Sequence, residues 1–313
     1  MEFSMPEASH KKNFSLAIRI AGTILSTALF VLLISRQKWE VVLEKATGIS
    51  PWVVALSLGF YLVSYGFNTL RWCILLWAQS VRIPFTKAYS ITWAGNFASN
   101  FLPSTIGGDG FRMLAINPYT QKKTISIGSV VLDRIINMSA MACLIPAPLI
   151  MFGESLKLLI NHTRLSSVGL PAGLTALFEK YSPKIVHAFK IWANRPWILA
   201  QAFLVAWPSN LFAMGATYAI AIQLDMHVNF WQVISVQTVT YFLSVLPISV
   251  NGYGLREVTY TTLYTLLGAS VEQASALALI TRLMTVLSTV PGALWLSAVV
   301  SNAAGLDESN PEE

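Results

Sequence analysis

Charged residues are scarce in this chain. Asp, Glu, Lys and Arg make up 12% of its 313 residues, whereas a soluble domain carries about 25%. Hydrophobic residues make up 54% of the sequence. A chain with so little charge has too few polar side chains to cover its apolar residues in water, so we predict an all-α polytopic membrane protein.

Cysteine and histidine are also rare. The two cysteines, Cys73 and Cys143, lie in predicted membrane helices, which argues against a disulfide framework and a zinc site. All four histidines lie in predicted tails or loops, and the sequence has no nucleotide-binding loop. We therefore expect no metal and no cofactor.

Long apolar runs are abundant. A helix needs roughly 18 or more mostly apolar residues to cross about 30 Å of hydrocarbon. Runs of this kind lie near 16–35, 52–77, 125–151, 197–222 and 273–300, and shorter runs lie at 86–102 and 230–247. We predict about seven transmembrane helices. The short runs need neighbouring residues or a re-entrant path to reach the far side.

The net charge of +6 does not indicate a nucleic-acid partner. The basic residues lie mostly in short loops, and more of them fall on one side of the predicted topology, as the positive-inside rule expects. This places the N-terminus in the cytoplasm. The polar start and the missing small-residue cleavage site predict an uncleaved first helix.

The chain contains an internal repeat. "LPSTIGGDGFR" at 102–112 recurs as "LPISVNGYGLR" at 246–256, with five identical residues at the same spacing. "PWVVA" likewise recurs as "PWILA", and "VVLDR" pairs with "ALITR". Two units of about 100 residues follow, at 51–151 and 196–300. With three crossings each, the second unit is inverted relative to the first, as in many transporters. An even number of crossings would make the repeats parallel.

Three further segments complete the organisation. Residues 1–50 hold the N-terminal tail, the first helix and a loop. Residues 152–195 are basic, with apolar residues at helical spacing, and predict a linker that lies along the cytoplasmic membrane surface. Residues 301–313 form an acidic tail.

Proline and glycine interrupt an apolar run in each copy of the motif. The predicted helix breaks comprise Pro103, Gly107, Gly108 and Gly110 in the first copy and Pro247, Gly252 and Gly254 in the second. Lipid cannot satisfy the backbone groups that such breaks release, so they must be buried in protein or line a watered cavity. We expect half-helices to start near Phe111 and Leu255 and to point their positive ends at that cavity.

Seven charged residues lie near the breaks: Asp109, Arg112, Asp133, Arg134, Arg256, Glu257 and Arg282. At roughly 2.5–3.5 kcal/mol each in a helix centre, they would cost about 20 kcal/mol if all faced lipid. We expect them to converge on one polar centre between the repeats. Asn100 and Asn251 are candidate neutral partners.

The four arginines outnumber the three carboxylates in this set. A surplus positive charge beside helix N-termini suits a phosphate, which the planar guanidinium binds with two hydrogen bonds. The alternative is that the charges only neutralise one another: Asp109 with Arg112, and Asp133 or Glu257 with an arginine of the other repeat.

The paired motifs N-x-x-L-P-x-x-x-G-G-D-x-x-R and L-P-x-S-x-N-G-x-G-x-R-E, with S-V-V-L-D-R between them, resemble the lysylphosphatidylglycerol synthetase transmembrane-region family. This family includes the flippase half of the bacterial multiple peptide resistance factor. The resemblance implies a multi-pass protein of the bacterial or archaeal plasma membrane that moves a phospholipid or glycolipid between leaflets. The resemblance carries over the prolines and glycines Pro103, Gly107, Gly108, Pro247, Gly252 and Gly254 as family motif residues. It also carries over Asn100, Asp109, Arg112, Asp133, Arg134, Asn251, Arg256, Glu257 and Arg282, which we expect to bind the substrate. Because the chain ends at Glu313, without the large soluble transferase domain of the synthases, we expect no aminoacyl transfer.

Two other classes of function compete with a lipid flippase. One is a non-catalytic membrane partner or anchor of a lipid-modifying synthase or glycosyltransferase, with 152–195 as the contact. The other is an intramembrane enzyme that uses Asp109 and Asp133 as paired carboxylates. "IGGD" lacks the first glycine of the G-x-G-D signature of intramembrane aspartyl proteases, and arginines lie beside both aspartates. We therefore expect that the chain is not an enzyme.

Overall fold

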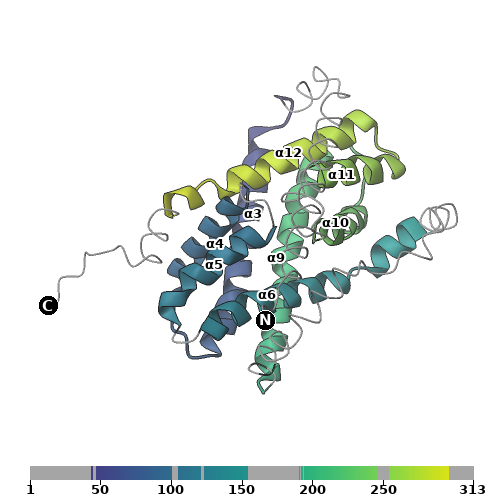
Figure 1. Ribbon diagram of the computed structural model, residues 1–313. Helices are drawn as coiled ribbons and strands as arrows, with labels where there is room; N and C mark the ends of the chain where they lie inside the picture. Colours follow the sequence, from purple (N-terminus) through teal and green to yellow (C-terminus); the bar gives the residue numbers. More distant parts are fainter. Residues whose placement is uncertain are drawn as a thin grey trace, which may run out of the picture.

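The computed structural model describes residues 44, 47–100, 105–120, 123–153, 190, 192, 194–245 and 254–295, with the backbone alone for 105–107. Every regular element within these ranges is a helix (Figure 1). In chain order the helices are α3 (Pro51–Trp77), α4 (Phe85–Ser99), α5 (Thr105–Ile116), η1 (Asn117–Tyr119), α6 (Lys123–Ala142), α9 (Pro196–Gln223), α10 (Phe230–Val245), α11 (Leu255–Leu266) and α12 (Val271–Thr289).

Four of the described helices are long and apolar enough to cross a membrane: Pro51–Trp77, Lys123–Ala142, Pro196–Gln223 and Val271–Trp295. They coincide with four of the five long apolar runs in the sequence. The fifth run, at 16–35, lies outside the described residues. An all-helical membrane protein is therefore confirmed, whereas a count of seven crossings stays a prediction.

The described helices in the two short apolar runs fall below the roughly 18 residues that a crossing needs. α4 has 15 residues and α10 has 16, so each is only about 23 Å long at 1.5 Å per residue. Each is followed by a 12-residue helix, α5 or α11. The lengths of the four helices in the first half, 27, 15, 12 and 20 residues, are close to the 28, 16, 12 and 19 residues of the second.

The helices that follow the two breaks, α5 and α11, start at different positions within the repeated motif. α11 starts at Leu255, as expected, and follows Gly254, whose φ of 80° is accessible to glycine at low cost. α5 starts at Thr105 rather than near Phe111, so the expected start was wrong by six residues. Gly107, Gly108 and Gly110 therefore lie inside a helix.

Close packing against α4 explains one of these glycines. A Cβ on Gly108 would collide with Ser99 Oγ and with the Gly95 carbonyl oxygen of α4. A Cβ on Gly95 would in turn lie 3.0 Å from the Gly108 carbonyl oxygen. The absence of both side chains lets α4 and α5 pack backbone to backbone. A Cβ on Gly110 would have nothing within 4 Å, so Gly110 has no such packing role.

The centre of the molecule is an antiparallel pair of helices, α3 and α9. Ser57 near the start of α3 donates to the carbonyl of Ala216 near the end of α9. Ser64 and Ser209 each donate a hydroxyl to the other's carbonyl, at 2.7 and 3.1 Å. Arg195, just before α9, reaches the carbonyl of Ala78, just after α3. Figure 1 shows the two helices side by side along this length.

The last long helix of each half packs on this central pair. α12 contacts α3 through Tyr65 and Ser288, whose hydroxyl oxygens are 3.0 Å apart. α6 contacts α9 through a hydrogen bond from Asn210 to Asn137. In Figure 1, α12 crosses the upper part of the pair and α6 the lower part.

The short helices also reach across to the opposite half. Asn100 at the end of α4 donates to Thr289 at the end of α12, at 2.9 Å. Asn137 of α6 donates to the hydroxyl of Tyr241 in α10, at 3.1 Å. Each half therefore completes the packing of the other.

The segment between the halves is described only at its end. Trp192 is fully buried, and its indole donates to the carbonyl of Leu75 at 3.0 Å. This contact ties the end of the predicted linker to α3. The rest of the predicted interfacial helix at 152–195 lies largely outside the described residues.

Candidate functional site

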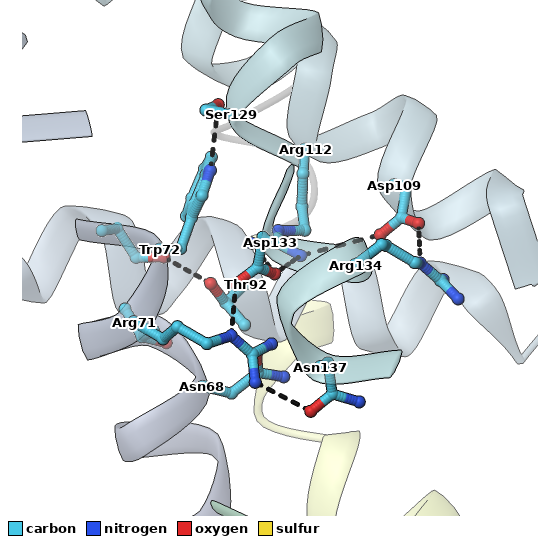
Figure 2. Close-up of polar contacts among 12 residues, drawn as sticks. Asn68, Arg71, Trp72, Thr92, Asp109, Arg112, Ser129, Asp133, Arg134 and Asn137 are labelled. Carbon is cyan, nitrogen blue, oxygen red and sulfur yellow. Dashed lines mark hydrogen bonds and ion pairs between the residues drawn. The ribbon is translucent and has the colours of Figure 1, made fainter. Parts of the chain in front are cut away.

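Asp133 is the centre of a buried ion cluster in the first half of the chain, the Asp133 cluster. It lies on the buried face of α6 and is 2% exposed. Arg71 of α3 donates from Nε to one carboxylate oxygen at 2.6 Å. Arg112 of α5 donates from Nη1 and Nη2 to the other oxygen, both at 3.2 Å. Three helices are thus joined through one carboxylate (Figure 2).

Asp109 extends this cluster towards the surface. Its carboxylate lies 3.6 Å from Nη1 of Arg112, one turn further along α5. It also accepts a hydrogen bond from Nε of Arg134 in α6. The Arg134 side chain is 36% exposed, whereas those of Arg112 and Asp133 are 6% and 2% exposed. Arg134 is therefore the arginine of this cluster that an outside ligand reaches most easily.

Neutral side chains hold the arginines in place. Arg71 donates to the side-chain oxygens of Asn68 and Asn137, at 2.7 and 2.8 Å. The guanidinium of Arg112 lies 4.3 Å from the centre of the Trp72 ring, in cation–π contact. The Trp72 indole donates to Ser129 of α6. The orientations of Arg71 and Arg112 are thus set before any ligand arrives.

The second half has a smaller ion cluster at the start of α11, the Glu257 cluster. Glu257 is fully buried and accepts from the backbone N–H of Gly254 at 2.8 Å, which caps the helix. Its other carboxylate oxygen lies 4.0 Å from Nε of Arg282 in α12. Arg256 lies 5.2 Å from the centre of the Tyr260 ring.

The expected single polar centre is replaced by these two clusters. The ion pairs of Asp133 and Glu257 in the described residues join them to arginines of their own half, not of the other repeat. The reason is geometric: α5 and α11 each pack against the helix that follows them, so Asp109 and Arg112 reach α6 and Glu257 reaches α12. Asp109 does pair with Arg112, as the neutralisation hypothesis expected.

Several predicted residues are not part of either cluster. Asn100 binds Thr289 instead. Pro103, Pro247, Asn251 and Gly252 lie outside the described residues, so their predicted roles stay predictions.

Sequence reasoning missed Arg71 in the cluster. A signal was available, because Arg71 is the only charged residue in the 27-residue apolar helix α3. Such a residue is costly in lipid and points to a buried partner. Counting Arg71, the described residues of the Asp133 cluster are three arginines and two aspartates, and those of the Glu257 cluster are the Glu257–Arg282 pair and the neighbouring Arg256. Among the described residues, arginines therefore outnumber carboxylates by one in each cluster.

This arrangement can bind an anion electrostatically. The carboxylates whose contacts are described face arginines rather than each other. No group of three or more potential metal-ligating residues occurs in the described part of the chain. A guanidinium held in a fixed orientation offers a phosphate paired donors.

The fold and these clusters define a multi-helix membrane protein with buried arginine-rich polar sites. A family model described as the lysylphosphatidylglycerol synthase TM region matches residues 19–292. Because the match covers most of the sequence, the chain belongs to this family, as the motifs predicted. A search of curated proteins found no match to this chain.

Proposed function

We propose that this protein moves a phospholipid or glycolipid between the two leaflets of a bacterial or archaeal plasma membrane. The observation that carries the proposal is the pair of arginine-rich clusters, in which the described arginines outnumber the described carboxylates by one. The lipid phosphate would bind at the arginines, and the acyl chains would stay in the bilayer.

The charge surplus supports binding rather than neutralisation alone. If the clusters only joined helices, equal numbers of cations and carboxylates would suffice and would cost less to bury. In the Asp133 cluster, Arg134 has the most exposed side chain, at 36%, so a headgroup would reach the cluster there. A phosphate there would gain charge-assisted hydrogen bonds in surroundings that exclude most water.

We further infer that the two halves are inverted repeats, as alternating access requires. The Ser64–Ser209 pair is separated by 145 residues, the offset of the sequence repeat, and the two residues make the same contact to each other. Phe67 and Phe212 stack at the same offset, with ring centres 5.8 Å apart. Residues related by a two-fold axis meet in this way. Because α3 and α9 run antiparallel, that relation would turn one half upside down.

We propose that lipid movement involves no covalent step. The carboxylates of the Asp133 cluster are engaged by arginines, which leaves neither in the role of a general base. The driving force would come from a gradient or from consumption of the lipid on one side.

The first helix would start from a cytoplasmic N-terminus.

Transfer of fluorescent phospholipids and isoprenoid-linked glycolipids in vesicles that contain the purified protein tests this function. Arg134→Gln and Arg256→Gln remove one cation from each cluster. Arg82→Gln removes an exposed arginine outside the clusters and is the matched control. We expect transfer by the wild type and the control, and at least a tenfold loss in the cluster variants.

Three results would separate the alternatives. Transfer that is insensitive to both cluster substitutions would overturn the arginine sites. Absence of transfer of every lipid by a folded wild-type protein would overturn the flippase proposal. Co-purification with a glycosyltransferase that depends on 152–195 would then favour the membrane-partner function.

A further inference from the structure

Two surface grooves lie at positions that correspond to each other in the two halves. The first, groove A, has a volume of about 420 Å³ and is lined by Phe85, Thr86, Lys87, Tyr89, Ser90 and Trp295. The second, groove B, has a volume of about 340 Å³, and its lining includes Cys143, Ala147, Ile150, Met151, Trp231 and Ser235. Neither contains a residue of the two ion clusters.

The linings correspond residue by residue. Thr86 and Ser90 of α4 lie 145 positions before Trp231 and Ser235 of α10, the offset of the Ser64–Ser209 pair. Trp295 lies 148 positions after Ala147, the offset that relates Arg134 to Arg282. Each groove is thus formed by the first short helix of one half and by residues just beyond the last long helix of the other. In Figure 1, the yellow end of α12 lies beside α4.

The grooves lie at opposite ends of the central helix pair. α4 follows the C-terminal end of α3, and α10 follows the C-terminal end of α9. Because α3 and α9 run antiparallel, their C-terminal ends point in opposite directions. Both helices are long enough to cross a membrane, so in a bilayer that they cross the two grooves would face opposite leaflets.

The chemistry of the linings fits a lipid. Groove B is largely apolar, and Ile150 and Trp231 at its edge are 86% and 64% exposed. A row of rings runs from Phe85 and Tyr89 of the groove A lining to the buried Trp93 behind them, with centres 5.7 and 4.8 Å apart. Such aromatic rows lie at the membrane interface. Lys87 adds a cation, which attracts an anionic headgroup.

We propose that grooves A and B are the two lipid portals of the protein, one open to each leaflet, and that their occupant is an anionic phospholipid. Acyl chains would lie against the apolar walls of either groove. In groove A the phosphate would contact Lys87. The described lining of groove B offers no such cation, because the position that corresponds to Lys87 is Gln232 of α10. The proposal rests on the proposed flippase function and extends it by naming where the lipid enters and leaves.

Environment-sensitive fluorophores on single cysteines test the portals. The native Cys143 is exposed in groove B and Cys73 is buried, so Cys143 can carry the groove B probe. Thr86→Cys in a Cys143→Ser chain carries the groove A probe. Leu204→Cys in the same background places a probe on α9, where Leu204 is 62% exposed and lies outside both grooves.

The quencher is phosphatidylglycerol with a spin-labelled acyl chain, added only to the outside of vesicles selected for one orientation through an N-terminal tag. We expect one groove probe to be quenched at once, at least threefold more than the Leu204→Cys probe. The other groove probe should be quenched later, at the rate at which the spin-labelled lipid reaches the inner leaflet. There the lipid is protected from ascorbate added outside the vesicles, so this protection measures transfer independently of the fluorophores.

Each result has a distinct reading. Immediate quenching of both groove probes, or quenching no stronger than at Leu204→Cys, while ascorbate shows transfer, would overturn the portals and leave the flippase function intact. Quenching of one groove only, without any transfer, would support portals on opposite sides and overturn the flippase function. If either groove probe becomes protected from quenching as the protein density in the vesicles rises, and not as the lipid concentration changes, the groove is occupied by a second copy of the chain.

Discussion

Replacing Asp133 with Asn is the most direct test of the buried cluster. The substitution keeps the size of the side chain and removes its negative charge. Arg71 and Arg112 are 3% and 5% exposed. Arg71 would lose the carboxylate that it contacts at 2.6 Å, and Arg112 would keep only the longer, 3.6 Å contact with Asp109. Breaking a buried ion pair costs about 3–5 kcal/mol, because the remaining charge stays buried without compensation.

We therefore expect Asp133→Asn to lower the free energy of unfolding by about 4 kcal/mol. At 1.4 kcal/mol per tenfold change, this is roughly a thousandfold shift towards the unfolded protein. The assay is tryptophan fluorescence during titration of the detergent-solubilised protein with a denaturing detergent. Of the ten tryptophans, Trp72 contacts the cluster, with the Arg112 guanidinium 4.3 Å from the centre of its ring.

Two comparisons make this prediction specific. Glu257→Gln keeps an acceptor for the Gly254 N–H and disturbs one ion pair at 4.0 Å, so it should cost roughly 1–2 kcal/mol. The double variant Arg112→Gln with Asp133→Asn should be less destabilised than the sum of its single variants, by about 0.5–3 kcal/mol. A cost of Asp133→Asn below about 1 kcal/mol, or strict additivity, would refute the reasoning.

Three further predictions test other parts of the structure. Gly108→Ala should destabilise the α4–α5 packing by at least about 1–3 kcal/mol, measured by the same titration, whereas Gly110→Ala, with open space around its Cβ, should stay within about 1 kcal/mol of the wild type. Ser64→Ala should lower stability by about 0.5–1.5 kcal/mol and Ser209→Ala by a similar amount, because each removes one of two reciprocal hydrogen bonds; strongly unequal effects would contradict a symmetric contact. Lys87→Gln should reduce transfer of phosphatidylglycerol at least fivefold more than transfer of a zwitterionic phospholipid in the vesicle assay, and an equal loss for both would remove the headgroup role of groove A.

The positions of the charged residues were predictable, whereas their partners were not. Asp109, Arg112, Asp133 and Arg134 were selected because charge near a helix break is costly in lipid, and the structure joins them in one cluster. Arg71 was overlooked because it lies in an uninterrupted apolar run, far in sequence from either break. Its partner is 62 residues away in the chain, and helical periodicity carries no information about contacts at that separation.

The helix start at Thr105 was missed for a related reason. Three glycines within four positions have low intrinsic helix propensity, so the sequence favours a later start. Packing of Gly108 against the backbone of α4 outweighs that preference. The start of α11 could be predicted from the sequence, because glycine adopts a positive φ at low cost and Gly254 does so directly before the helix.

The sequence by itself determined the membrane class, the helical architecture, the family and the two-fold repetition of its motifs. These follow from composition, from the length of apolar runs and from short-range spacing, which depend only on neighbouring residues. Only the tertiary structure decided that the charges divide into two clusters, that Arg71 belongs to one of them, and that two matching grooves lie at opposite ends of the α3–α9 pair. Those features depend on which helices pack together, and packing joins residues that the chain keeps far apart.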